Sequence, residues 1–373
     1  MLTKIAVVSP LRHLLREFPA NIKFCFAYGS GVFKQTDNSN SENMLDLIFV
    51  VRDASKWHAE NLQKNPRHYA QPMRFLGEKA ITKMQEKSGA GIYYNTLIRT
   101  NQGQLIKYGV ISEVLLVEDL LDWNHLYLSG RLHKPVKVLV EPDESSQLRT
   151  ALVQNLHSAV HAALLLLPEH FTEIDFFRKI TGLSYHGDFR MIFGENKDKI
   201  NNIVLPQLQH FKQLYEPVLR HFDNYVDIPK LDNMAVTCRQ DTSPVTKVHH
   251  LNHLPRMPQV RLIKAWSYGP RLRDTEDCLR AIAHDPECCD ILEQCLKDIV
   301  WRSSVTQSLK GIVTAGLTKS VKYSGAKIVK MLRSNVSDQC TLPSQRRNSS
   351  QIDNIVEAVV KKTETKGAEK RVE

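Results

Sequence analysis

The sequence has no apolar run long enough to cross a lipid bilayer. Its longest runs, residues 159–168 and 44–51, reach about half of the ~20 residues that a spanning helix needs. Cysteine is also scarce. The seven cysteines are odd in number and scattered, which argues against a disulfide framework and favours a reducing compartment. The cluster at 288–295 lacks the paired spacing of a zinc site. We therefore predict no membrane span, no disulfide framework and no zinc site at these cysteines.

The charge balance favours a negatively charged partner. Lys and Arg number 50 against 40 Asp and Glu, so the formal net charge of the 373-residue chain is +10. This excess fits nucleic acid, a nucleotide or an acidic lipid surface without distinguishing among them. The length allows two domains, each with its own hydrophobic core.

The most informative segment is a glycine-rich turn followed by a buried carboxylate. Residues 44–51 form a nearly continuous apolar run, typical of a strand buried on both faces, yet the run contains Asp46. A charge there is costly unless a cation or several donors meet it. Ahead of it, Gly29, Ser30 and Gly31 can turn tightly and present backbone N–H groups to an anion. This layout predicts a nucleotidyl-transfer site in which the carboxylate holds Mg²⁺ and the turn holds the triphosphate.

One part of the usual acidic motif is missing. Nucleotidyltransferases of the polymerase-β type usually carry two acids that flank one apolar residue, but Ile48 stands two positions after Asp46. Asp53 could supply a second carboxylate, although its position favours capping a helix that extends to about residue 64. Lys107 lies in a strand pattern where a lysine is otherwise unfavourable. It either faces the triphosphate or lies on an edge strand facing solvent.

Two further segments have both a functional and a purely structural interpretation. The glycine-rich turn at 89–95 ends in Tyr94 and Asn95, which either pack against a base or ribose or belong to a plain hairpin. Further along, Asp188 lies close to Arg190 ahead of an apolar stretch. These two residues form either an internal ion pair within a turn or the wall of a second domain that brings a metal or phosphate ligand across a cleft.

The order of elements predicts an α/β (α+β) protein with a mixed sheet that helices cover on one face. Residues 1–140 form the sheet domain, and residues 148–300 a second, mainly helical domain. Residues 225–275 are irregular and give no clear prediction. The predicted strands are 22–28, 45–51, 92–99, 104–112 and 136–140, and the predicted helices are 11–18, 53–64, 117–128, 148–167, 172–183 and 196–219.

Residues 306–334 differ in character from the rest of the chain. At 100° per residue their apolar side chains fall on one arc and their basic side chains on the opposite arc, which predicts an amphipathic helix. The helix either lies in a membrane interface with its basic residues toward acidic head groups, or packs on the catalytic domain. Residues 335–373 are polar and charged, and are predicted to be disordered. The basic residues are Lys319, Lys322, Lys327, Lys330 and Arg333.

Several blocks of sequence resemble the mitochondrial translocator assembly and maintenance protein family and follow one another in the order found in that family. Its members are phosphatidate cytidylyltransferases (CDP-diacylglycerol synthases). The resemblance extends from about residue 11 to residue 320. It is far more specific than the Gly-Ser motif alone, because each block is long and all occur in the same order. The blocks are residues 26–33, 44–51, 89–95, 105–112, 119–136, 182–191, 284–288 and 307–316.

The resemblance implies a nucleotidyltransferase domain, a winged-helix-like second domain and a C-terminal membrane-binding helix. It implies the conversion of CTP and phosphatidate, with Mg²⁺, to CDP-diacylglycerol and pyrophosphate. The enzyme would act peripherally on the matrix side of the mitochondrial inner membrane, on an anionic lipid surface, and its product feeds cardiolipin synthesis. The family name also leaves open a non-catalytic assembly factor for the import machinery.

The expected site follows from these matches together with the residue patterns. Asp46 is the expected metal ligand, and catalysis is assigned to Asp46, Lys107, Asp188 and Arg190. The nucleotide is expected to contact Tyr28, Gly29, Ser30, Gly31, Tyr94 and Asn95. Transfer to RNA ends remains the main alternative reaction, but no interleaved basic and aromatic platform is present, so no nucleic-acid partner is expected.

Overall fold

The computed structural model describes residues 10–33, 44–193, 198–229, 237–266 and 274–315. All of them belong to one unit of the chain, residues 1–327. Among the helices of these ranges, none combines the length and the apolar character that crossing a bilayer requires.

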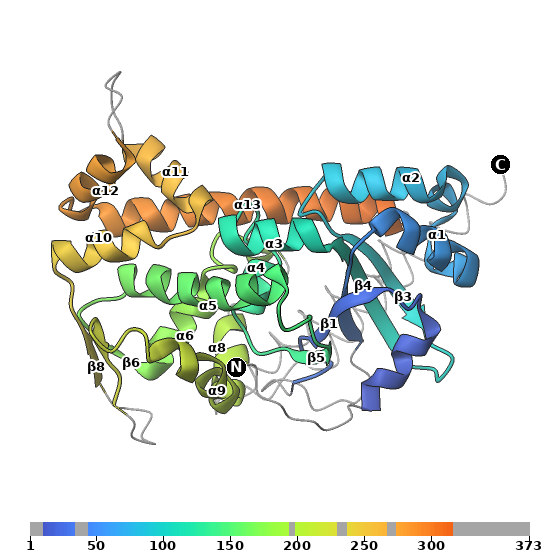
Figure 1. Cartoon of the computed structure of the whole chain (residues 1–373), viewed down its shortest axis with the longest axis horizontal. Coiled ribbons are helices and arrows are strands. Elements are labelled where there is room, and N and C mark those ends of the chain that lie inside the picture. Colours follow the sequence, from blue (N-terminus) through green and yellow to red (C-terminus); the bar gives the residue numbers. More distant parts are fainter. Residues whose placement is uncertain (1–9, 34–43, 194–197, 230–236, 267–273, 316–373) are drawn as a thin grey trace, which may run out of the picture. The chain divides into compact units, whose positions relative to one another are not determined.

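A mixed sheet of five strands, in the order β3-β4-β2-β1-β5, forms the amino-terminal part (Figure 1). β2 pairs with β4 in parallel, and the other neighbours are antiparallel. All five predicted strands are confirmed to within one residue, and with them the mixed α/β class. The strands are β1 (Ile22–Tyr28), β2 (Leu45–Val51), β3 (Tyr93–Arg99), β4 (Leu105–Ser112) and β5 (Lys137–Val140).

Helices cover both faces of this sheet, so the prediction of a single covered face is wrong. Phe26 and Ile48 pack on the face that meets α3 and α5, whereas Phe49 and Tyr108 pack on the face that meets η1 and α1. The physical reason is the apolar run itself, because a strand with apolar side chains on both sides needs cover on both sides. The elements around the sheet are η1 (Pro10–Glu17), α1 (Ala54–Lys64), η2 (Pro66–His68), α2 (Gln71–Lys87), α3 (Glu113–Asp122) and α4 (Ser129–Leu132).

The remainder is mainly helical and includes a small sheet in the order β6-β8-β7. Its helices are α5 (Gln147–Leu165), α6 (Glu173–Gly182), α7 (Arg190–Phe193), α8 (Lys199–Val204), η3 (Leu205–Gln207), α9 (Leu208–Leu219), α10 (Pro244–Asn252), α11 (Arg256–Trp266), α12 (Thr275–Ala283) and α13 (Cys288–Ala315), and its strands are β6 (His170–Thr172), β7 (Val226–Asp227) and β8 (Thr237–Gln240). α5 joins both parts, because Leu148 and Leu152 pack in a core of the sheet while Ala159 and Leu164 pack in the helical core.

The helix predicted at 117–128 is displaced and shortened. α3 instead ends at Asp122, followed by the C-cap residue Trp123, whose φ of 54° is left-handed, and an irregular loop leads to α4. The cause is Asp119, a buried residue whose carboxylate accepts backbone N–H groups from His125, Leu126, Leu128 and Ser129 at 2.8–3.2 Å. These four bonds stabilise the loop against continuation of the helix.

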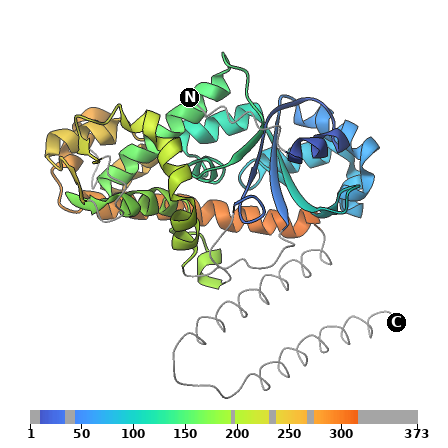
Figure 2. The ribbon, with the colours of Figure 1, turned by 90° about the horizontal axis from the view of Figure 1, so that it is seen from below.

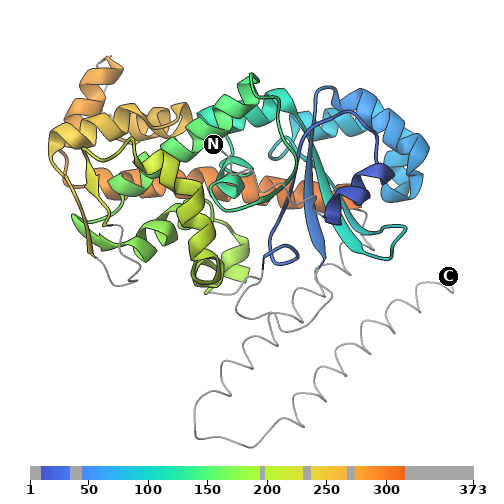
Figure 3. The same cartoon turned by 60° about the horizontal axis from the view of Figure 1, so that its bottom comes forward.

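α13 does not begin at residue 306, where the amphipathic helix was predicted to start. It begins at Cys288 and ends at Ala315, packing on α11 and on β3, and Figures 2 and 3 show it as the orange helix that reaches the sheet. Near its end Gln307 accepts from the Ala90 amide at 3.0 Å, and Lys310 donates to the Ser88 carbonyl at 2.6 Å. For residues 306–315 the structure therefore gives the packed alternative.

Candidate active site

Three polar side chains form a row across the middle of the sheet. Tyr28 of β1 is paired with Asp46 of β2, and Asp46 is paired with Lys107 of β4. Tyr94 joins them from β3, since its backbone partner Gly109 lies two residues from Lys107 on the same face. The ammonium group of Lys107 lies 3.7 Å from Asp46 Oδ1 and 4.5 Å from the centre of the Tyr94 ring. The structure thus brings together four residues predicted at separate places in the sequence.

The Asp46 carboxylate is held in a position that suits a bound cation. Its Oδ1 is buried and receives no hydrogen bond from the described residues. The side chain as a whole remains 24 % exposed, and that of Lys107 17 %. Most buried polar atoms in native proteins are hydrogen-bonded, so a carboxylate oxygen that meets only an ammonium group at 3.7 Å, at a partly open position, is typical of a ligand site.

The glycine-rich turn lies directly against this carboxylate. Gly29 has a φ of +78°, a conformation that favours glycine, and a Cβ there would lie 3.6 Å from Asp46 Oδ2. A Cβ on Gly31 would lie 2.7 Å from the Met44 carbonyl oxygen, so the turn packs on the start of β2 too closely for any side chain. The Gly29 carbonyl accepts from Val32 and Phe33 at 3.1 Å.

The turn leaves backbone donors for an anion. No described residue accepts a hydrogen bond from the amides of Ser30 and Gly31. Backbone N–H groups at such a turn, next to a bound cation, form a site for phosphate oxygens. The turn and Asp46 therefore lie next to each other, and their roles in holding a triphosphate and Mg²⁺ stay a prediction.

The segment after α3 adds two residues that were not predicted from the sequence, Tyr127 in the loop and Arg131 in α4. The Arg131 guanidinium lies 4.2 Å from the centre of the Tyr28 ring and 5.4 Å from that of Tyr127. Burial alone would raise the pKa of the Tyr127 hydroxyl, but the positive charges of Arg131, Arg190 and Lys107 outweigh burial and lower it. Burial raises the pKa of Tyr28 to about 12, so that ring stays neutral. The Asp119 bonds position this loop, and no local pattern reveals that it reaches the sheet.

Asp188 and Arg190 form an ion pair beside this loop. The Arg190 Nε donates to Asp188 Oδ1 at 2.9 Å and to Oδ2 at 3.1 Å, and its Nη2 donates to Oδ2 as well. The Asp188 side chain is 4 % exposed, and its carboxylate oxygens are engaged by Arg190. Burial lowers the pKa of Arg190, but the bonds to Asp188 and the proximity of Tyr127 outweigh this effect and raise it. The structure thus contains the internal ion pair that one interpretation predicted, and the role of the pair in bringing a metal or phosphate ligand stays a prediction.

Asn95 does not join the row. It is paired with Tyr108 on the face that packs against η1 and α1, opposite to the face of Tyr94. There it is 3 % exposed and, through its side chain, lowers the otherwise burial-raised pKa of Tyr108. Adjacent strand residues point to opposite faces, so Tyr94 and Asn95 cannot both reach one ligand.

The donor set fits Mg²⁺ bound through a single carboxylate. Among the described residues, Asp46 belongs to no group of three or more His, Cys, Asp or Glu side chains that could hold a metal, and Asp188 is engaged by Arg190. Mg²⁺ prefers oxygen ligands, retains several waters and is commonly held by one or two carboxylates together with substrate phosphates. Asp46 and the phosphates of a nucleotide would satisfy this requirement.

The five basic residues predicted to bind membrane, Lys319, Lys322, Lys327, Lys330 and Arg333, lie outside the described residues.

Comparison with known proteins identifies the class. A family model described as "Phosphatidate cytidylyltransferase, mitochondrial" matches residues 11–330. Curated proteins of that name are similar over most of their length: the Danio rerio protein is 46 % identical over 325 residues (86 % of this chain, 94 % of that protein). The Bos taurus protein is 47 % identical over 322 residues (86 % and 93 %), and the Drosophila melanogaster protein 45 % over 337 residues (86 % and 97 %).

The sheet, the turn and the similarities define an enzyme that transfers nucleotidyl groups. More narrowly, the chain belongs to the mitochondrial phosphatidate cytidylyltransferase family, as its resemblance to that family predicted.

Proposed function

We propose that this chain transfers CMP from CTP to phosphatidate at the row formed by Tyr28, Asp46 and Lys107. The reaction yields CDP-diacylglycerol and pyrophosphate, the activity for which its relatives are named. The observation that supports this site most strongly is the buried Asp46 Oδ1, which receives no hydrogen bond from the described residues and lies next to a lysine and a glycine-lined turn. In mitochondria, the product would supply cardiolipin synthesis.

The reaction requires positioning and charge neutralisation more than a strong base. The attacking phosphate oxygen of phosphatidate is already ionised near neutral pH, so it needs no general base. The enzyme must align it with the α-phosphorus and stabilise the departing pyrophosphate. Mg²⁺, when bound, would neutralise charge shared between the phosphates and Asp46. The amides of Ser30 and Gly31 would hold the β- and γ-phosphates, and Lys107 would stabilise the leaving group.

Arginines complete the positive surface of the site. Arg131 is stacked on Tyr28 at 4.2 Å, at the end of the row nearest the turn. A guanidinium presents a rigid fork of donors that matches phosphate oxygens, and we assign Arg131 to the phosphate of either substrate. Arg190 supplies a further charge near Tyr127. We assign Asp188 to positioning Arg190 rather than to binding metal, because its carboxylate is already engaged.

The decisive experiment follows the label of α-labelled CTP into phosphatidate. Asp46→Asn removes one charge and no volume, so the fold should persist while turnover falls by at least about 100-fold. Asp53→Asn is the matched control, because Asp53 caps α1 by accepting from Lys56 and asparagine caps equally well. Retained turnover in Asp46→Asn would reject the proposed metal ligand. Label that appears in RNA instead of lipid, or no label with capture of import components, would reject the assigned reaction.

The membrane part of the proposal concerns the residues beyond α13. The lipid substrate stays in its bilayer, so the enzyme must bind there, peripherally and on the matrix side of the inner membrane. Basic residues near an acidic surface contribute about 1 kcal/mol each before screening. One variant replaces the five basic residues after α13 by Gln: Lys319, Lys322, Lys327, Lys330 and Arg333. This variant should sediment less with cardiolipin-containing vesicles and should be less active on bilayers. The matched control replaces four lysines and one arginine of the tail: Lys361, Lys362, Lys366, Lys370 and Arg371. Equal binding of both variants would refute the assignment.

A further inference from the structure

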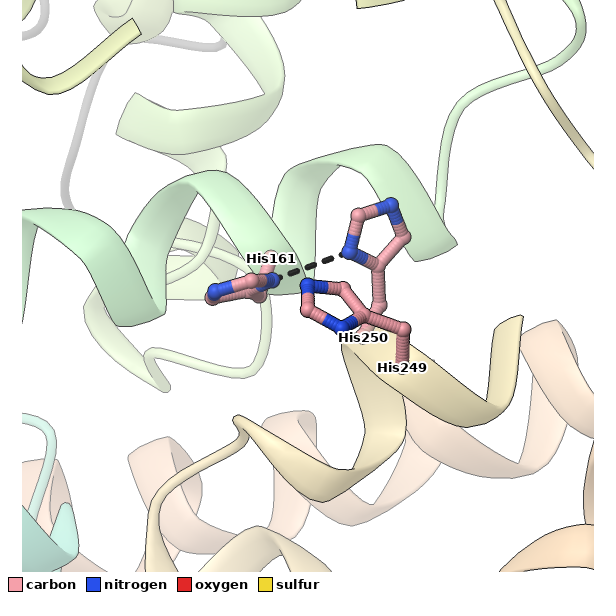
Figure 4. Close-up of side chains that lie close together, drawn as sticks. All are labelled: His161, His249 and His250. Atoms are coloured by element: carbon pink, nitrogen blue, oxygen red, sulfur yellow. Dashed lines mark hydrogen bonds between the residues drawn. The ribbon is translucent and has the colours of Figure 1, made fainter. Parts of the chain in front are cut away.

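A cluster of histidines joins α5 to α10, away from the residues of the proposed reaction. His157 and His161 are one helical turn apart on α5, and His249 of α10 lies four residues before His253, the C-cap of that helix. His250 follows His249 and turns toward His161, as Figure 4 shows. Side chains four residues apart lie on the same face of a helix, so the two pairs meet across the helix contact.

Three of these rings converge on one point. His161, His249 and His250 each offer a ring nitrogen, and the three nitrogens lie within 4.8 Å of one another. The Nδ1 atoms of His161 and His250 are 2.9 Å apart (Figure 4). In a tetrahedral zinc site with Zn–N bonds of about 2.0–2.1 Å, ligand nitrogens are about 3.3 Å apart. Shifts of the side chains alone would reach that spacing.

The hydrogen bonds around the cluster leave one nitrogen unsatisfied. A neutral imidazole has one N–H and one lone pair, so the contact between His161 and His250 uses a single proton. The Nε2 of His250 is buried and has no hydrogen-bond partner among the described residues. Each neutral ring thus keeps one lone pair that a metal could take.

We propose that His161, His249 and His250 bind a transition-metal ion of the Zn²⁺ class. Imidazole nitrogen suits zinc, copper, nickel and cobalt, whereas Mg²⁺ prefers oxygen, so this site and Asp46 would take different ions. The metal would replace the N–H···N contact of His161 and His250 by two coordinate bonds. Water completes the coordination, and the ion fastens α10 to α5 within the helical part of the chain.

The residues around the three histidines also suit a metal site, because they leave access from solvent and hold the rings in place. His253 is exposed, and the centre of its ring lies 4.3 Å from that of His249 and 4.8 Å from that of His161, which provides an entry from solvent. Its Nδ1 lies 2.8 Å from the His249 carbonyl, a bond that leaves Nε2 as the lone pair. Tyr225 stacks on His249 at 4.3 Å, and Phe222 packs on His161 at 4.7 Å. These aromatic walls limit the rotation of the rings.

The test is a titration of the full chain, without an affinity tag and stripped by chelator, with Co²⁺. We expect about one equivalent to bind and to produce the visible absorption of tetrahedral cobalt. His249→Gln, at a half-buried position, should weaken binding by at least about 100-fold, since even residues that only orient ligands contribute 10–100-fold. His161→Gln is the second variant. His170→Gln is the matched control, because His170 is exposed on β6 and should leave the spectrum unchanged.

Each result decides the proposal. Cobalt absorption bands that are lost in His249→Gln and kept in His170→Gln support the metal site. Added Zn²⁺ should also raise the melting temperature of the wild-type chain and leave that of His249→Gln unchanged. Failure of the wild-type chain to bind Co²⁺, or an unchanged spectrum in His249→Gln, overturns it. The readout is independent of CMP transfer. Asp46→Asn should keep the cobalt spectrum, so the two sites can fail separately.

Discussion

Gly31→Ala tests how closely the phosphate-binding turn must approach β2. An added Cβ would lie 2.7 Å from the Met44 carbonyl oxygen and 3.1 Å from Leu45 Cα. Both are backbone atoms of the strand that carries Asp46, so neither can move independently. Ordinary contact begins at 3.4 Å, and the turn must therefore retreat by about 0.7 Å from the strand. Misplacing reacting groups by about 1 Å can cost roughly 100-fold in rate, which predicts a loss of about 10- to 100-fold in kcat/KM for CTP.

The assay measures labelled CTP converted to lipid, together with thermal unfolding of the same protein. Gly103→Ala is the control, because its φ of +80° strains an alanine while the space around it is open. It should lose about 1 kcal/mol of stability and keep its activity. Gly29→Ala combines a φ of +78° with a contact at 3.6 Å, and should fall between the two in activity. Wild-type kcat/KM in Gly31→Ala would show that the turn does not hold the triphosphate.

Three other predictions follow from the described residues. Arg131→Lys keeps the charge but loses the planar fork stacked on Tyr28, so kcat/KM should fall about 10-fold without change in the melting temperature; an unchanged rate would remove Arg131 from the site. Burial lowers the pKa of His58 to about 4 and that of His133 to about 3, so the stability they confer is complete above about pH 6.5 and is lost as the pH falls. Urea unfolding from about pH 7.5 to 5 should lose about 1.4 kcal/mol per pH unit for each ring below pH 6.5, and a flat profile would contradict this. Burial lowers the pKa of Lys310 to about 7, so wild type should gain stability relative to Lys310→Met between about pH 7 and 10; a constant difference would show that this lysine is not desolvated.

The sequence predicts the strands of this fold better than its helices. Each strand is a short apolar run bounded by a turn, a pattern that burial on both faces requires. α2 was missed because its pattern is irregular: Phe75 is 92 % exposed and Leu76 61 %, and Gly77 interrupts the helix with a φ of 76°. α3 was misplaced because the Asp119 carboxylate accepts from backbone amides up to ten residues further along the chain. The helical periodicity of the sequence does not show such a contact.

Some residues of the candidate site can likewise be predicted from the sequence, and others cannot. Asp46 and Lys107 could be found because each places a charge in an apolar strand pattern. The turn could be found because its glycines lie just ahead of such a strand. Arg131 and Tyr127 follow no such signal, since they become part of the site only through the folded loop after α3. Asn95 was predicted to contact the nucleotide together with Tyr94, but the two lie on opposite faces of the sheet, as the two-residue period of a strand requires.

The contacts of α13 connect the proposed membrane-binding segment to the sheet that carries the candidate site. Gln307 and Lys310 complete backbone hydrogen bonds of the turn that leads into β3, where Tyr94 meets Lys107. Lys310 is 6 % exposed, and burying a lysine is costly unless its donors are satisfied, so this attachment is specific rather than incidental. The basic residues that we assign to the membrane follow directly in sequence. The segment that we propose to bind lipid is therefore continuous in sequence with a helix end that is fixed to the sheet, and loosening that end by Lys310→Met should lower activity on bilayers more than activity on phosphatidate dispersed in detergent.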